Sequence, residues 1–255
     1  MTEDPEPIGA GRILFEAGAE FSDDQVYPAS GLEGNLWRIG VVGLSFGISS
    51  IAELQVDGGL VNHLSIEELS LAPLSGLLDL DGESTTDIED IVIATKVRLL
   101  SETPNRLALA LRFATKLPNA TNESGLGLDT TDFYVSLLGA RTVQSIRVVG
   151  NIGLGILGDA TNATRQNDVL TYGASLARAI TDRAELVGEI NGRVSTRTDN
   201  VPPGTETRGL LRFGARYTRN AIRFDGNLFF GLTSYDPTFG FGGGITYVFQ
   251  GFNVP

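Results

Sequence analysis

The sequence predicts an all-β fold, a transmembrane antiparallel up-and-down β-barrel of about twelve strands. Three observations lead to this prediction: stretches of about 10–14 residues in which apolar and polar residues alternate, connections that are alternately short and long, and charges that keep to one face of each stretch. A tilted transmembrane strand needs about 9–11 residues, whereas strands of soluble proteins cluster near about 5–6. The lengths therefore favour a membrane barrel over a soluble sandwich.

Composition excludes several other classes of protein. The 255 residues carry 31 acidic and 19 basic side chains, a net charge of −12, and nucleic-acid-binding proteins usually present a basic surface, so we expect no nucleic-acid partner. The chain has no cysteine and a single histidine, His63, which excludes disulfides, thiolate catalysis and multi-histidine metal sites. No apolar run approaches the length of a membrane-spanning helix. We also expect no cofactor.

Each predicted strand follows from alternation bounded by Gly, Pro, Asn, Asp and Ser clusters. The stretch 146–157 is typical, because Ile152 and Leu154 share one face while Asn151 and Gly153 share the other. In the last stretch Phe239 and its apolar successors alternate with glycines, an inner face that suits a strand passing crowded side chains. The predicted strands cover 12–21, 35–48, 52–62, 91–100, 106–117, 133–142, 146–157, 169–179, 185–195, 208–217, 222–232 and 238–249.

The connections between these stretches alternate in length. Short ones lie at 49–51, 101–105, 143–145, 180–184 and 218–221, and longer ones near 22–34, 63–90, 118–132, 158–168, 196–207 and 233–237. Outer-membrane barrels have short periplasmic turns, long extracellular loops and an even strand number. We therefore predict a periplasmic N-terminal tail at 1–11, the barrel at 12–249 with a long acidic extracellular loop at about 63–90, and a periplasmic C-terminal tail at 250–255.

The N-terminus lacks the basic, apolar and small-residue segments of a secretory signal peptide. We therefore expect a mature chain in the bacterial outer membrane, in contact with outer-membrane lipids and lipopolysaccharide. Aromatic residues fall on the apolar face, many near strand ends, as in the aromatic girdles of such barrels.

Charge placement supports the membrane and predicts the lumen. Of 22 charged residues in the twelve stretches, 19 lie opposite the apolar face, and the exceptions Arg38, Arg141 and Arg178 lie near strand ends, where a long cationic side chain reaches lipid head groups. The inward charges are twelve basic and seven acidic, so we predict a narrow, net-basic lumen. Its predicted lining residues are Arg98, Arg112, Lys116, Glu185, Glu189, Arg193, Arg208, Arg212, Arg216, Arg223 and Asp225.

Two interpretations of this lumen stay open. Opposite charges on neighbouring strands support each other, so the residues form an Arg–Glu network that fills the interior. Alternatively, the ladder of Arg208, Arg212 and Arg216 along one strand lines a weakly anion-preferring pore.

The acidic loop offers a partial match to a calcium site. Asp79, Asp81 and Glu83 place oxygen ligands at alternate positions, but the rest of the calcium-loop spacing is missing. We therefore predict no metal site and keep these three residues as calcium candidates. The alternatives are a solvated acidic surface loop and a short helix that folds over the barrel.

One region resembles a known family. The stretch 113–118 ends in Lys116-Leu117-Pro118, and a glycine-rich loop at 125–132, the strand at 150–155 and the stretch 185–192 follow. Together they resemble outer-membrane transporters grouped as the meta-pathway phenol-degradation family, over roughly 106–249. The resemblance implies a pore or uptake barrel for aromatic or other small solutes, and no catalytic residue.

We therefore predict a porin-like channel for passive uptake of small solutes, aromatic or anionic, and no enzyme. The alternative is a closed structural or complex-associated barrel, whose partner proteins the sequence does not identify. A lipid-acting enzyme ranks below both, because its histidine base would have to face the membrane and parity places His63 inward or in a loop.

Overall fold

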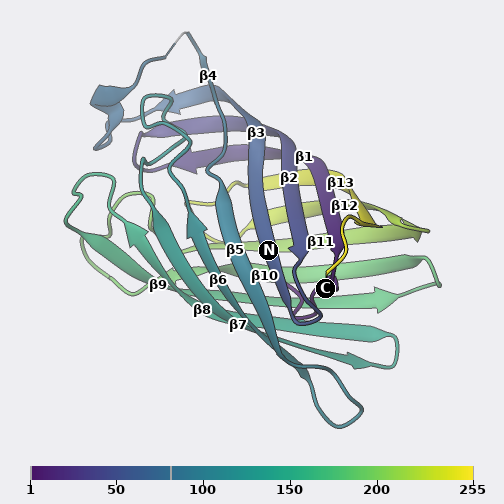
Figure 1. Cartoon of the computed structure of the whole chain (residues 1–255). Coiled ribbons are helices and arrows are strands. Elements are labelled where there is room, and N and C mark those ends of the chain that lie inside the picture. The colour runs from purple at the N-terminus through teal and green to yellow at the C-terminus, as the bar shows by residue number, and fades with distance from the viewer. Residues whose placement is uncertain (1, 81, 255) are drawn as a thin grey trace.

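The computed structural model, which describes residues 2–80 and 82–254, is a closed antiparallel β-barrel of twelve strands with one extra short strand (Figure 1). The predicted fold class is therefore confirmed. The barrel strands are β1 (Arg12–Tyr27), β2 (Leu32–Gly47), β3 (Ala52–Leu69), β5 (Val92–Leu100), β6 (Ala108–Lys116), β7 (Asp132–Val143), β8 (Ile146–Gly158), β9 (Gln166–Ala179), β10 (Ala184–Ser195), β11 (Arg208–Arg219), β12 (Ile222–Gly231) and β13 (Phe239–Gln250).

Each barrel strand pairs with its neighbours along the chain, and β13 closes the ring by pairing with β1. The closing register runs from Arg12 opposite Gln250 to Asp23 opposite Phe239. The extra strand β4 (Ser84–Asp87) pairs with the far end of β3 at the loop-rich end of the barrel. No described helix is long and apolar enough to cross a membrane.

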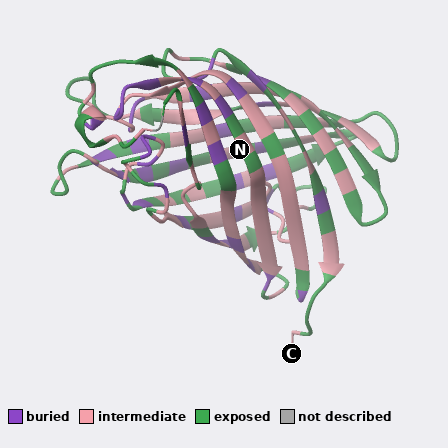
Figure 2. Cartoon of the chain, turned by 90° about the horizontal axis from the view of Figure 1, so that it is seen from above, coloured by how far each residue is buried: buried purple, intermediate pink, exposed green. Residues whose placement is uncertain are grey.

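The wall carries many exposed apolar side chains on its outside, which form an apolar belt. Figure 2 shows that exposed residues alternate with less exposed ones along the strands. On β8, Ile152 and Leu154 are 55% and 57% exposed, whereas the intervening Gly153 is buried. Alternation of this kind is expected when one face meets lipid and the other the lumen. Arg141 and Arg178 lie exposed near strand ends at the short-turn end, as predicted.

Arg38 is a correction, because a β-bulge in β2 reverses its side. Gly40 has a φ of 67°, and the register between β1 and β2 shifts there by one residue. Ile39 is therefore 52% exposed, and Arg38 faces inward. It pairs with Glu20 at 3.2 Å and with Glu89.

The connections also differ from the prediction in two places. Only four residues separate β1 from β2, because both strands extend into the predicted loop 22–34. The predicted loop 63–90 begins as strand, since β3 continues to Leu69, and it then contains a 3₁₀ turn (Ser75–Leu77) and β4. Leu78 and Leu80 of this loop pack against the buried residues Leu32, Leu36 and Leu64. The loop therefore packs against the wall through its leucines.

Candidate functional site

Glycines on the inner face of β13 let side chains reach across that strand. Arg212 on β11 pairs with Glu20 on β1 at 2.8 Å, and Arg223 on β12 pairs with Glu16 on β1 at 3.1 Å. A Cβ at Gly242 would lie 3.5 Å from the Glu20 side chain. The small inner face predicted for the last strand therefore serves this ion-pair network.

The N-terminal segment, residues 2–8, lies among the inward-facing side chains. The Glu3 carboxylate accepts from Lys96 at 3.0 Å and pairs with Arg112 at 3.2 Å. Three more contacts extend the arrangement: Glu6 with Arg98 at 2.6 Å, Asp4 with Arg147, and the Asp4 carbonyl with Lys96 at 2.9 Å.

Backbone groups of the same segment also bind the wall. The Ile8 amide donates to Glu53 at 2.7 Å, and the Thr2 amide donates to Glu189 at 2.9 Å. The segment is thus tied to β3, β5, β6, β8 and β10 on different sides of the lumen. We predicted a periplasmic tail at 1–11, outside the barrel. For residues 2–8 this prediction is wrong, because they contact inward-facing side chains. The acidic residues at 3, 4 and 6 are the signal in the sequence for these contacts. Their partners can be identified only after the alternation of the strands has placed four cations inside, namely Lys96, Arg98, Arg112 and Arg147.

The ionisation of Glu3 reflects this environment. Burial alone favours the neutral acid, but the charges of Lys96 and Arg112 and a hydrogen bond from Gln55 outweigh it. Together they hold the pKa of the Glu3 carboxyl below its usual value. Glu3 is therefore an anion in this site at neutral pH.

The loop-side half of the lumen holds three of the predicted residues, Lys116, Arg193 and Arg208. Lys116 pairs with Asp90 at 2.9 Å and with Asp132 at 3.1 Å. Arg193 and Arg208 instead donate to backbone carbonyls, and among the described residues neither has a carboxylate within 4 Å.

Glu185, Arg216 and Asp225 stand at one level on three neighbouring strands near the short turns. Their register positions face one another, but residues 2–80 and 82–254 contain no ion pair within 4 Å for any of the three. Of the eleven predicted residues, Arg98, Arg112 and Glu189 contact the N-terminal segment.

The calcium candidates do not form a site in the part of the chain that is described. Asp81 lies outside the described residues. Within the rest of the chain, no group of three or more acidic or histidine side chains is arranged to hold a metal ion.

His63 lies in β3, where its ring nitrogen contacts the Thr86 hydroxyl of β4 at 2.7 Å. It stands opposite Trp37, which is 40% exposed on the outer face. The prediction that His63 points inward or lies in a loop is therefore wrong, because the reversal at the Gly40 bulge applies to this end of the wall as well.

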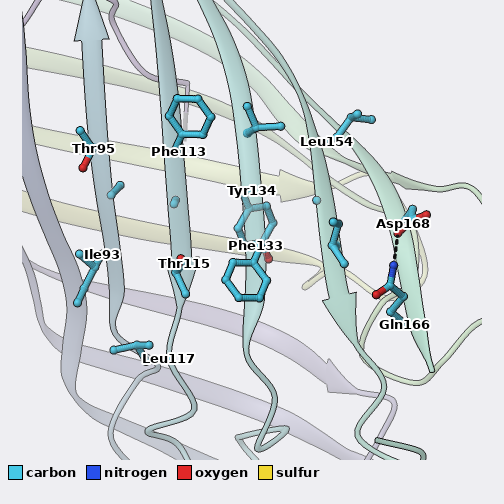
Figure 3. A pocket seen from close by; sticks show the side chains of 15 residues that line it. Ile93, Thr95, Phe113, Thr115, Leu117, Phe133, Tyr134, Leu154, Gln166 and Asp168 are labelled. Carbon is cyan, nitrogen blue, oxygen red and sulfur yellow. Dashed lines mark hydrogen bonds between the residues drawn. The ribbon is translucent and has the colours of Figure 1, made fainter. Parts of the chain in front are cut away.

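A separate groove of about 830 Å³ lies on the wall of β5–β9 near the loop end (Figure 3). Phe113 and Phe133, each more than half exposed, flank it, and Thr95 lies between apolar neighbours. Gln166 donates to Asp168 at its edge, at 3.2 Å. Its exposed apolar side chains, among them Phe113, Phe133 and Leu154, belong to the outer face of the wall.

Comparison with known proteins places this geometry in a structural class. No family model and no curated protein sequence matches the chain. Among solved structures, an outer membrane channel from Pseudomonas putida F1 superposes with a TM-score of 0.67 at 13% identity, covering 98% of this chain and 99% of that one. The fold is that of an outer-membrane β-barrel.

Two further barrels support the same class. The translocator domain of the autotransporter NalP from Neisseria meningitidis has a TM-score of 0.53 at 13% identity, covering 94% of this chain and 88% of that one. The NanC porin has a TM-score of 0.53 at 7% identity, with coverages of 92% and 98%. At these identities the similarity concerns the fold alone, and the resemblance to the meta-pathway phenol-degradation family stays a prediction.

Proposed function

We propose that the chain is an outer-membrane channel for passive uptake of small solutes, and that its own N-terminal segment closes the lumen in the state described here. The observation that carries the proposal is the binding of residues 2–8 to five strands across the interior. The ion pairs and hydrogen bonds that anchor the segment can be exchanged for contacts with water, because each such bond contributes a net of only about 0.5–3 kcal/mol. Outer-membrane lipids and lipopolysaccharide surround the belt in this proposal.

The segment also indicates the class of solute. Its three carboxylates, from Glu3, Asp4 and Glu6, occupy cations on β5, β6 and β8. Without the segment, those cations are available to carboxylates arriving from outside. We therefore propose small organic anions, aromatic acids included, as the solutes.

Conductance in planar bilayers tests the channel. The variant that lacks residues 2–8 should conduct at least several-fold more than the full chain, and its reversal potential in a KCl gradient should shift toward anion selectivity. Full-length Glu3→Gln/Asp4→Asn/Glu6→Gln should behave in the same direction, since its segment loses the ionic contacts. The matched control is Asp23→Asn/Asp24→Asn, which removes acids from the opposite end of β1.

The second candidate is a closed structural barrel, and the Arg212–Glu20 and Arg223–Glu16 pairs favour it because they fill part of the interior. In that case the deletion variant folds but conducts no more than the full chain. That result would overturn the channel and leave the barrel intact.

We expect no enzymatic activity. The lipid-acting alternative would depend on His63, whose ring contacts Thr86 on the outer face. Lipid turnover that disappears in His63→Ala would contradict this expectation.

A further inference from the structure

We infer that Arg193 and Arg208 form an anion-binding site in the loop-side half of the lumen, and that it takes the carboxylate of a small solute. The inference rests on the proposed function, since it names the place where an anionic solute is held. The site lies apart from the cations that the N-terminal segment covers.

The first argument is position. Arg193 on β10 and Arg208 on β11 are direct partners in the register of the two strands. Both lie on the inner face, an even number of residues from the inward pair Glu189 and Arg212. Directly opposite residues have Cβ atoms about 4.5–5.5 Å apart, where like charges destabilise each other. An anion between the two guanidinium groups removes that repulsion.

The second argument is the way the two side chains are held. Arg193 donates to the carbonyls of Gly204 at 2.7 Å and Glu206 at 2.9 Å, and Arg208 donates to the Val26 carbonyl at 2.9 Å. These contacts orient the guanidinium groups but do not neutralise them. Each guanidinium has five N–H donors, so both retain donors for an oxyanion.

The third argument concerns the nearby acids. Glu206 and Asp236 are the acids of the neighbouring loops, but neither forms an ion pair with Arg208 within 4 Å among the described residues. Asp236 accepts from the Gly209 amide at 2.9 Å and the Thr233 hydroxyl at 2.7 Å, and Glu206 accepts from the Gly204 amide at 2.9 Å. The Asp236 carboxylate and one oxygen of Glu206 therefore organise the loops around the arginines, while the second, buried oxygen of Glu206 has no hydrogen-bond partner among the described residues.

The contrast with other inward cations completes the case. Lys96, Arg98, Arg112, Lys116 and Arg212 each have a carboxylate within 4 Å supplied by this chain. The Arg193–Arg208 pair, within the residues described, does not. Arg216 also has no ion pair within 4 Å there, but its direct register partners are the acids Glu185 and Asp225. In this inference, the carboxylate of a solute supplies the negative charge that carboxylates of the chain supply to the other cations.

Calorimetric titration of the full-length protein in detergent with sodium benzoate tests the site. The unmodified protein should show saturable binding, and Arg193→Gln and Arg208→Gln should each weaken it at least tenfold. Arg208→Lys should fall between, because it keeps the charge but loses the planar fork. Arg178→Gln, which removes an exposed arginine from the outer face of β9, should leave binding within about twofold, the scale expected for a side chain outside the site.

Inorganic phosphate and sodium acetate are the competing probes. Competition by both supports a site for small oxyanions, whereas competition by acetate alone supports selectivity for carboxylates. Absence of saturable benzoate binding, or equal affinity in Arg208→Gln with an unchanged heat-modified gel shift, overturns the site. Binding is measured without a bilayer, so failure of conductance with intact binding would reject the channel and keep the site.

Discussion

The two halves of the lumen differ in how their cations are neutralised. In the half near the short turns, Lys96, Arg98, Arg112 and Arg147 receive carboxylates from residues 3–6 of the N-terminal segment, and Lys96 also pairs with buried Glu53. In the loop-side half, Arg193 and Arg208 are held by backbone carbonyls. A count of inward charges on the strands omits the carboxylates of the N-terminal segment. It therefore overstates the positive charge of the half near the short turns, and it is closer to the charge of the loop-side half.

We expect the largest loss of stability from a substitution in the half near the short turns, where the chain's own carboxylates neutralise the cations. Lys96→Met leaves Glu53, which is 1% exposed, without its cation, and loss of one partner of a buried pair costs about 3–5 kcal/mol. Arg208→Met in the other half leaves no carboxylate unpaired within 4 Å, so we expect a loss of about 1 kcal/mol. Urea unfolding in lipid vesicles measures both free energies. Equal losses would show that the halves do not differ in this way.

On the inner face of β13 beside the loop-side half, close packing rather than charge restricts which side chains fit. A Cβ at Gly240 would meet the Phe229 ring and the Phe21 carbonyl, and overpacking of this kind costs about 1–3 kcal/mol. We therefore expect Gly240→Ala to destabilise the barrel. The control is Gly150→Ala, since a Cβ there meets nothing within 4 Å. A free energy of unfolding for Gly240→Ala that matches the control would contradict the packing.

Acid should release the segment from the neutralised half. The pKa of Glu3 is lowered in the docked state, so its contribution is present above the usual glutamate pKa and is lost as pH falls through the docked value. The groups that face it are Lys96 and Arg112, with Glu53 and Asp57 competing for the same cations. Conductance should rise as the pH falls below the usual glutamate pKa of 4.5, and Glu3→Gln should flatten the rise. A pH-independent current would exclude this contribution.

The smallest effect concerns the outer wall. Arg178→Ala removes an exposed side chain and should change stability by less than about 0.5 kcal/mol. Arg38→Ala removes the partner of Glu20 and Glu89 and should cost about 1–3 kcal/mol. Comparing the two by urea unfolding tests whether the Gly40 bulge turns Arg38 inward.

Parity was sufficient to predict the wall. Alternation and loop lengths predicted twelve strands that overlap the observed ones, because a lipid-facing side and a lumen-facing side impose a period of two. The errors arise where the period is broken. One extra residue at Gly40 moved Arg38, Trp37 and His63 to sides that an unbroken alternation does not predict.

Alternation along the strands could not predict which residues fill the lumen. Residues 2–8 have no alternation, and their contacts join residues more than 40 positions apart, as between Glu3 and Lys96 or Asp4 and Arg147. Local patterns carry no information on such pairs. Arg193 and Arg208 were predicted to face inward, but the absence of a nearby carboxylate depends on loop geometry.

The pairing of β13 with β1 has a consequence for assembly. One edge of the first strand, β1, pairs with the last strand, β13. The hydrogen-bonded barrel is therefore complete only after Phe239–Gln250 has been synthesised. Until then β1 and β12 present open edges, which hydrocarbon does not tolerate. Because residues 2–8 precede β1 in the chain, they are already synthesised, and available to occupy the interior, when β13 pairs with β1.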